Sequence, residues 1–195
     1  MLDRGSAIAR DDGAPGSGGG NALAARRTVA LAGGGSILIR PVEPRDARLL
    51  NACFEHLSAV SRYRRFLTTI DHLSKQQITY LTDVDHERHE ALVALDAVTG
   101  DGVGIARSVR DLEDPRRAEV TIVVADLWQG HGVGSGLIER LAARAQAAGV
   151  ERFTARMLIG NHAGHRLLER VADEIDEHED AAAIELNARM RTFPH

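Results

Sequence analysis

The sequence predicts an α/β domain on a mixed sheet. Runs typical of β-hairpins flank a group of helical patterns, and a nearly continuous apolar run at 118–125 leads through a glycine-rich turn into a further helical pattern. With 195 residues, 44% of them hydrophobic, the chain is long enough to bury one sizeable core. We therefore expect one domain with a tail rather than two domains.

The domain is expected to span residues 27–195, after a disordered tail at residues 1–26. This tail is rich in glycine and has few large apolar side chains, so it cannot bury enough surface to offset the entropy of ordering it. The first folded element is a hairpin, in which strands at 28–32 and 36–40 flank a turn at Gly33–Gly35.

Three helices are expected next. Pro44 suits the first turn of a helix, and apolar side chains follow it at helical spacing. These side chains are Ala47, Leu49, Leu50, Cys53, Phe54 and Leu57. Ser58 or Ser61 can cap a second helix that runs through Leu67, and Ser74 can cap a short third helix.

Three strands are expected in the middle of the chain. Residues 91–95 and 103–106 form a hairpin around a turn at 99–102, and residues 107–110 extend its second strand. The run at 118–125 is nearly all apolar, which is typical of a central strand.

A helix follows the glycine-rich turn and ends at Gly149, a residue typical of the position after a helix. One face of this helix is apolar and carries Val133, Leu137, Ile138, Leu141 and Ala145. The remaining elements are a strand, a helix and two weaker strands, at residues 152–158, 161–171, 174–178 and 182–186.

The composition argues against several classes of protein. With 28 acidic and 24 basic residues, the net charge of −4 gives no overall attraction to nucleic acid or to an anionic membrane. No apolar run approaches the roughly 20 residues that span a bilayer, and the apolar run after Arg26-Arg27 is too short for an export signal. The single cysteine, Cys53, fits a reducing compartment and a buried position. We expect a cytoplasmic protein.

The stretch ADLWQGHGVGSG at 125–136 joins the central strand to the following helix. A helix that begins here leaves backbone N–H groups unpaired, which suits a phosphate group, and glycines allow close approach. A P-loop would need Lys-Ser/Thr where Ser135-Gly136 continues, and a dinucleotide fingerprint would need an acidic residue after the next strand, whereas Glu151 precedes it. The alternative is that the glycines only ease a tight turn.

Within this stretch, Gln129–Gly134 matches the Gln/Arg-x-x-Gly-x-Gly/Ala signature, and the chain resembles the GNAT N-acetyltransferase superfamily over about residues 28–190. Ile39-Arg40-Pro41-Val42 and Asn161 add to the resemblance. The segments at 57–67 and 117–130 are similar to bacterial protein-lysine acetyltransferases. The resemblance implies a mostly antiparallel mixed sheet flanked by helices, with acetyl-CoA as co-substrate and no metal.

The resemblance also implies the positions that bind the coenzyme. These are Val123, Val124, Ala125, Gln129, Gly130, His131, Gly132, Val133, Gly134, Ser135 and Asn161. The loop would hold the pyrophosphate, and a backbone N–H from 123–125 would polarise the thioester carbonyl. For Asn161 the alternative is a plain helix cap.

Glu119 is the expected catalytic base. At pH 7 a lysine-type amine is almost entirely protonated, a penalty of about 4.6 kcal/mol for the free amine, so a base is useful. Glu119 lies in an otherwise apolar strand, where burial would tune the carboxylate for proton transfer. The resemblance places the catalytic glutamate at the same position. The alternative is a glutamate paired with one of the many arginines.

The part of the sequence that is expected to bind the acceptor departs from the family's pattern. Many members of the family carry a thiolate-protonating tyrosine where this chain has Leu168, and Gly164 and Val171-Ala172 also depart from the pattern. Tyr63, in the basic and aromatic run 62–66, is expected near the acceptor, whereas the arginines of that run are expected to lie along an amphipathic helix.

Two histidine-containing groups have alternatives. The stretch at 83–90 contains possible metal ligands but is interpreted as a solvated loop. His131, His162 and His165 either meet near the phosphates or are exposed polar residues.

The expected activity is acetyl transfer from acetyl-CoA to an amine, with a protein lysine as acceptor. The alternatives are a small-molecule amine acceptor and a non-catalytic domain that senses acyl-CoA.

Overall fold

The computed structural model describes residues 26–31, 34–180 and 182–192. Of the expected disordered tail at 1–26, all but Arg26 lies outside the described residues. Ala32 and Gly33, expected in the first hairpin, also lie outside them.

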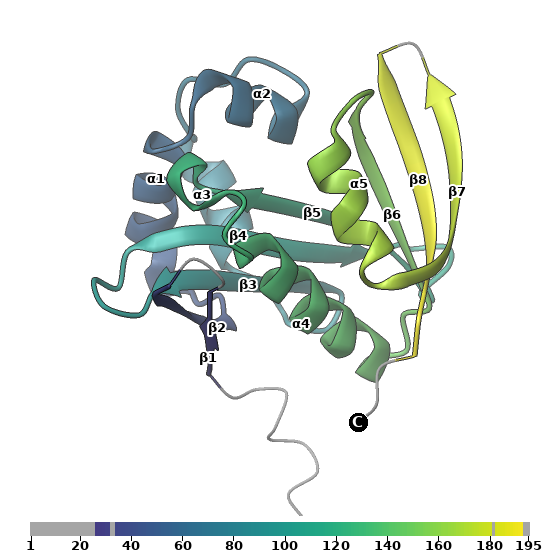
Figure 1. Ribbon diagram of the computed structural model, residues 1–195, viewed down its shortest axis with the longest axis horizontal. Helices are drawn as coiled ribbons and strands as arrows, with labels where there is room; N and C mark the ends of the chain where they lie inside the picture. The colour runs from purple at the N-terminus through teal and green to yellow at the C-terminus, as the bar shows by residue number, and fades with distance from the viewer. Residues whose placement is uncertain (1–25, 32–33, 181, 193–195) are drawn as a thin grey trace, which may run out of the picture.

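Within the described residues, eight strands form one sheet in the order β1-β2-β3-β4-β5-β6-β8-β7 (Figure 1). The strands are β1 (Arg27–Ala30), β2 (Ser36–Pro41), β3 (His89–Asp96), β4 (Gly102–Arg110), β5 (Arg117–Val124), β6 (Arg152–Leu158), β7 (Ala172–Asp180) and β8 (Ala183–Met190). All neighbouring strands pair antiparallel except β5 and β6, which pair parallel. The predicted mixed, mostly antiparallel sheet is confirmed.

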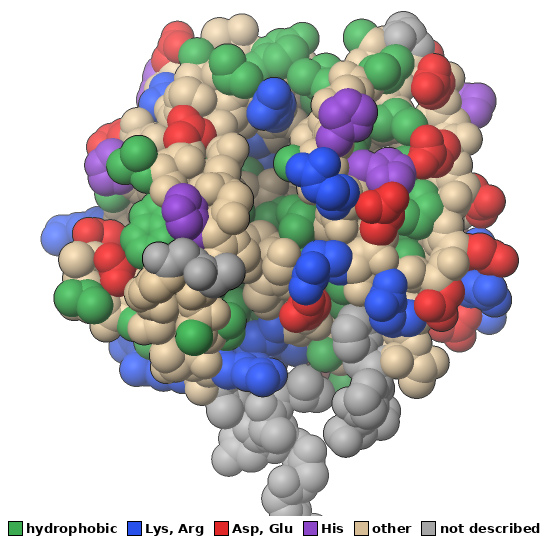
Figure 2. All heavy atoms as spheres, in the orientation of Figure 1, with side chains coloured by type: hydrophobic (Ala, Val, Ile, Leu, Met, Phe, Trp, Pro, Cys, Tyr) green, Lys and Arg blue, Asp and Glu red, His purple; other side chains and the backbone are tan. Residues whose placement is uncertain are grey.

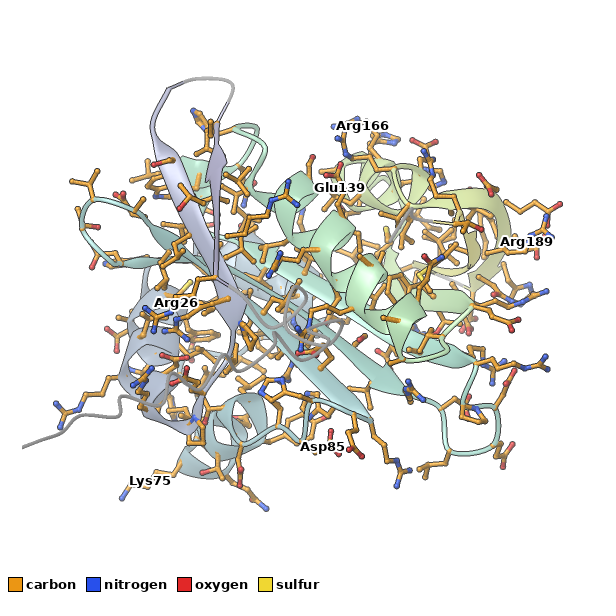
Figure 3. The ribbon with its side chains drawn as sticks, turned by 90° about the horizontal axis from the view of Figure 1, so that it is seen from below. Arg26, Lys75, Asp85, Glu139, Arg166 and Arg189 are labelled. Carbon is orange, nitrogen blue, oxygen red and sulfur yellow. The ribbon has the colours of Figure 1, made fainter. Side chains whose placement is uncertain are left out.

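The helices lie on both faces of this sheet. They are α1 (Ala47–Glu55), α2 (Ala59–Phe66), α3 (Lys75–Thr82), α4 (Val133–Ala147) and α5 (His162–Glu169). The first three form a group at one end of the sheet, and α4 runs across the strands on the other face (Figures 1 and 3). Among the described residues, no helix is both long enough and apolar enough to cross a membrane.

The caps of α2 and α3 follow the sequence. The Ser58 side chain accepts a hydrogen bond from the Ser61 N–H, so Ser58 rather than Ser61 caps α2. Ser74 caps α3 in a reciprocal arrangement with Gln77. The α1 helix is shorter than expected, because Pro44–Asp46 forms a separate 3-10 turn and Leu57 is buried beyond the end of the helix.

The main core lies between α4, α5 and the sheet. Its fully buried side chains include Ile39 of β2, Leu137 of α4 and Phe153 of β6. The α4 helix packs closely on β2, because a side chain at Gly136 would bring its Cβ to 3.2 Å from the Cδ1 atom of Ile39. A glycine here therefore serves packing.

A buried ion pair holds the chain that leads into α1. The Arg40 guanidinium donates to both carboxylate oxygens of Asp46, at 2.6 and 2.7 Å, and the Glu43 N–H donates to the same carboxylate at 2.9 Å. Arg40 and Asp46 are 8% and 4% exposed. Removing either member would leave the other charge buried without a partner and would strongly destabilise the fold.

The stretch at 83–90 is not entirely a solvated loop, as the sequence suggested. The Asp85 carboxylate accepts three backbone N–H groups in a turn, but Glu90 is buried in β3. Glu90 pairs with Arg144 of α4 at 2.5 Å and with His86 at 2.8 Å. The acidic and histidine side chains here therefore join α4 to β3.

Candidate active site

The two parallel strands at the centre of the sheet diverge. The register of β5 and β6 runs only from Arg117 to Glu119 on one side and from Arg152 to Thr154 on the other. Beyond Glu119, β5 continues to Val124 without β6 beside it. Figure 2 shows that this face of the molecule is hollowed between α2 and α5, over the region where the strands diverge. The candidate site is built along this free edge.

Backbone groups of β5 point toward the free edge at alternate residues. The Ala125 N–H donates to Val103 O at 2.9 Å, on the β4 side. Because successive residues of a strand direct their N–H groups to opposite sides, Val124 directs its own toward the free edge. Of the expected donors at 123–125, Val124 is therefore the residue whose N–H faces the opening, and the N–H of Ala125 is already used.

The turn after β5 takes the form that its glycines allow. Gly130 and Gly132 have φ angles of +78° and +94°, which strain any residue with a side chain. Gly132 is the N-cap of α4 and offers no side chain, and the first backbone bond at this end runs from the Gly136 N–H to Gly132 O at 3.0 Å. The N–H groups of the helix before Gly136 have no acceptor within the helix, so they suit an anion.

The glycines of this turn divide into two kinds. A Cβ at Gly130 would meet none of the described residues within 4 Å. A Cβ at Gly134 would lie 3.2 Å from Leu167 of α5, so that residue permits helix packing. The glycines of this stretch therefore relieve strain in the turn, allow α4 to pack on α5 and leave room for a ligand to approach.

A polar network ties this turn to α2. Asp126 accepts hydrogen bonds from the Ser58 N–H at 2.8 Å, from the Ser61 hydroxyl and from the Gln129 amide at 3.0 Å. The Gln129 amide also donates to Val124 O at 3.1 Å. Although desolvation opposes ionisation, the hydrogen bonds from Ser61 and Ser58 hold the pKa of Asp126 below its ordinary value. Gln129 therefore braces the turn through its side chain.

Glu119 stands where the two strands separate, but its expected burial is wrong. Its side chain is exposed, whereas Ala118 and Val120 on either side are buried. The reason is the alternation of a strand: Ala118 and Val120 face the main core, and Glu119 faces the side of the sheet that α2 and α3 cover only in part. No ion pair to Glu119 is present among the described residues, so the alternative of a glutamate paired with an arginine is not supported.

The start of α5 has a structural explanation. The Asn161 side chain accepts from the Gly164 N–H at 3.2 Å, which makes Asn161 an N-cap. A Cβ at Gly164 would lie 2.9 Å from that same side chain and 3.0 Å from the Met157 sulfur of β6, so a larger residue there would displace these two side chains. Leu168 is 3% exposed and belongs to the main core. It offers no proton to the site.

The three histidines do not form one group. His165 of α5 pairs with Glu177 at 2.5 Å and with Glu169 at 3.2 Å, and His162 is exposed. His131 is exposed beside the turn, with its ring 2.9 Å from Gln129 O. Within the described residues, no three His, Cys, Asp or Glu side chains come together in a group that would hold a metal ion.

The residues around α1 and α2 follow the sequence prediction in part. Cys53 is buried, so the expected buried position is confirmed, and burial raises the pKa of its thiol to about 11. Arg62 lies over the ring of Phe54 at 4.5 Å, as expected for an arginine along an amphipathic helix. Tyr63 is exposed.

Sequence reasoning missed several residues beside Glu119. Arg65 of α2, Tyr80 of α3, and His89 and Arg107 of neighbouring strands gather on the side of the sheet that Glu119 faces. Arg107 carried a signal, because this charged residue directly follows the run Val103–Ala106 within one strand. Its partners come from distant parts of the chain, which spacing in one sequence does not reveal.

Comparison with known proteins gives one consistent family. The family described as "Acetyltransferase (GNAT) domain" matches residues 36–172. The chain is 36% identical over 134 residues to Acetyltransferase Pat from Mycolicibacterium smegmatis, and 32% identical over 124 residues to an acetyltransferase from Pseudomonas aeruginosa. These matches cover 68% and 62% of this chain but only 40% and 65% of the two relatives, so the chain corresponds to part of their length.

A solved structure shows the same architecture. The GNAT domain of S. lividans PAT superposes with a TM-score of 0.76 at 26% sequence identity. The match covers 85% of this chain and 97% of that domain.

Proposed function

This chain belongs to the GNAT acetyltransferase family, and from that membership we propose that it transfers an acetyl group from acetyl-CoA to an amine. The observation that carries the proposal is the free edge of β5, which runs from the Glu119 carboxylate to the N-terminus of α4. A base, a backbone donor and an anion site thus lie in order along one strand and the turn that follows it.

The coenzyme fits the features of this edge. The first turn of α4 offers N–H groups that have no acceptor within the helix, at its positive end. A side chain at Gly130 would meet none of the described residues within 4 Å, so we expect a phosphate to approach the backbone there. Acetyl-CoA supplies the activated thioester. In the proposal, Val123, Val124 and Ala125 line the path of the coenzyme, and Asn161 contacts it from the start of α5.

The chemistry requires one proton to leave the amine and one negative charge to be stabilised. In the proposal, Glu119 accepts the proton of the attacking amine, directly or through water. The Val124 N–H donates to the thioester oxygen as negative charge develops there. The C–S bond then breaks, an amide remains, and the thiolate takes a proton from water, since Leu168 offers none.

A lysine side chain on a protein is the proposed acceptor. The segments at 57–67 and 117–130 are similar to bacterial protein-lysine acetyltransferases, and α2, which contains most of the first segment, borders the opening. A small-molecule amine is the second candidate. The exposed position of Glu119 and the exposed Tyr63 are compatible with a wide entrance for either.

Labelled acetyl-CoA tests the acceptor. The protein is incubated with it in the presence of lysine-containing proteins, of short lysine peptides and of free small amines. We expect label on lysine side chains, located by mass spectrometry. Label on small amines alone would leave the transferase assignment intact and overturn the protein acceptor. Tight acetyl-CoA binding without any transfer would support a sensor domain instead.

Replacement of Gly132 by alanine tests the turn. Because φ is +94° there, we expect Gly132→Ala to lower the free energy of unfolding by about 1 kcal/mol and to weaken acetyl-CoA binding. Gly149→Ala is the matched control, since its φ of +89° imposes the same strain far from the turn. Urea denaturation and calorimetric titration measure both effects. Equal acetyl-CoA affinities in the two variants would contradict the proposed role of the turn.

A further inference from the structure

An apolar pocket on the α1–α3 side of the sheet contains two arginines. Its cavity volume is about 50 Å³, and its walls include Phe54, Leu57 and Phe66 from the helices. Thr121 and Val123 of β5 form part of its floor, so the pocket adjoins the strand on which the reaction is proposed to occur. Arg65 and Arg107 line the same cavity.

Arg107 is buried with few partners. It is 4% exposed, its Nη2 donates to Leu81 O at 3.2 Å, and its Nε is buried without a hydrogen-bond partner among the described residues. Its guanidinium also lies 5.2 Å from the centre of the Tyr80 ring. Burial, followed by the charge on Arg65, lowers the pKa of Arg107 to about 10.

Arg65 adds a second positive charge to the same pocket. It is half-buried and lies against the ring of Phe66 at 4.8 Å. Glu119 is the acidic group whose charge acts on Arg65, but the two do not form an ion pair, and neither arginine has an ion-pair partner within the part of the chain that the structure describes. The neighbouring His89 stays neutral, because burial and then the charge on Arg107 lower its pKa to about 4.

Two like charges in an apolar pocket are unfavourable unless an anion accompanies them. A buried charge without an ion-pair partner is strongly unfavourable. The contacts of Arg107 with Leu81 O and with the Tyr80 ring do not explain such a charge, because a neutral side chain could make them. Planar, forked guanidinium groups match a carboxylate in particular, and the small apolar cavity leaves room for one with a short aliphatic chain.

We propose that Arg65 and Arg107 form a subsite that binds a carboxylate carried by a substrate of this enzyme. This inference rests on the proposed acetyl-transfer function for its place in the reaction. The subsite selects either an acyl group that ends in a carboxylate or an amine acceptor with a carboxylate close to the amine. The chemistry of recognition is the same for both, and the acyl group has the shorter route, because Thr121 and Val123 line both the pocket and the strand at the thioester.

A binding experiment tests the subsite without coenzyme. Sodium butyrate is compared with butyramide, its neutral isostere, at matched ionic strength, and thermal unfolding of the full chain is followed. We expect butyrate to raise the midpoint and butyramide to have little effect. The Arg107→Met and Arg65→Met variants should lose this difference, and Arg64→Met, with an exposed side chain on the same helix, should keep it. Equal midpoints with the two compounds in the wild-type chain would overturn the proposal.

A kinetic experiment identifies the source of the carboxylate. One arm compares succinyl-CoA with acetyl-CoA, using an amine that has no carboxylate. The other arm uses acetyl-CoA and compares an amine that has a nearby carboxylate with the corresponding carboxamide. In one of the two arms, Arg107→Met should lower kcat/KM for the substrate with the carboxylate by about 10- to 100-fold. For the substrate without the carboxylate, kcat/KM should change by less than about twofold. Arg65→Met serves where Arg107→Met does not fold.

The outcomes separate this inference from the proposed function. Equal losses for charged and uncharged substrates in both arms would mean a structural role and overturn the subsite. If no substrate is turned over at all, the proposed function fails, and the butyrate comparison still decides whether the arginines bind a carboxylate.

Discussion

Glu119→Gln should lower kcat by about 10²- to 10⁴-fold at neutral pH and leave acetyl-CoA affinity unchanged. The amide cannot accept a proton, so only the small fraction of amine that is already deprotonated reacts. Glu119 is exposed and makes no ion pair among the described residues. The free energy of unfolding of the variant should therefore lie within about 0.5 kcal/mol of the wild-type value. Steady-state kinetics and calorimetric titration measure the two effects.

The pH dependence distinguishes a base from a structural residue. As pH approaches the lysine pKa of about 10.4, free amine becomes abundant, and the deficit of Glu119→Gln should shrink. A deficit that stays constant with pH would remove the assignment of Glu119 as base. Glu113→Gln, another exposed glutamate but outside the site, is the matched control and should behave as the wild type does.

Asp46→Ala should lower the free energy of unfolding by about 3–5 kcal/mol. The change leaves the Arg40 guanidinium buried at 8% exposure without its carboxylate, and it leaves the Glu43 N–H without its acceptor. Urea denaturation measures the loss. Glu174→Ala is the control, because it breaks an exposed pair with Arg189 that screening already weakens. Equal losses in the two variants would contradict the importance of burial.

The Arg40–Asp46 pair also makes the free energy of unfolding depend on pH in the acidic range. Desolvation acts against the charged form of Asp46, but the hydrogen bond from Arg40 and the one from the Glu43 backbone outweigh it and lower the pKa of the folded state. A lowered pKa stabilises the fold above the unfolded value of about 3.9, and this contribution is lost as pH falls from there through the folded value. Asp46→Asn should therefore show less acid dependence than the wild type below about pH 4. Identical slopes would contradict this assignment.

The fold could be predicted from the sequence wherever local patterns decide it. The apolar run at 118–125 and the capping serine Ser74 gave correct elements, because strand burial and helix caps depend on neighbouring residues. The weak strands at 174–178 and 182–186 are instead a long hairpin over β7 and β8. β7 is an edge strand with mostly exposed acidic side chains, so it has little apolar alternation to reveal its length.

The position of the glycine-rich turn could be predicted from its motif, but the burial and the neighbours of the site's side chains could not. The turn at 129–135 lies at the start of α4, as its glycines indicated. The exposure of Glu119 was not predictable, because it depends on which helices cover each face of the sheet. The same holds for Glu90, which is joined to Arg144 across 54 residues of sequence, and for Arg107, whose neighbours come from α2 and α3.

Thermal unfolding with acetyl-CoA tests the central claim most directly. If the turn at 129–135 and the free edge of β5 bind acyl-CoA, acetyl-CoA at about 100 times its Kd should raise the free energy of unfolding by about 2.7 kcal/mol. Acetyl-pantetheine, which lacks the pyrophosphate, should stabilise the protein much less at the same concentration. The account is contradicted if acetyl-CoA produces no shift at any concentration, or if the two compounds stabilise the protein equally.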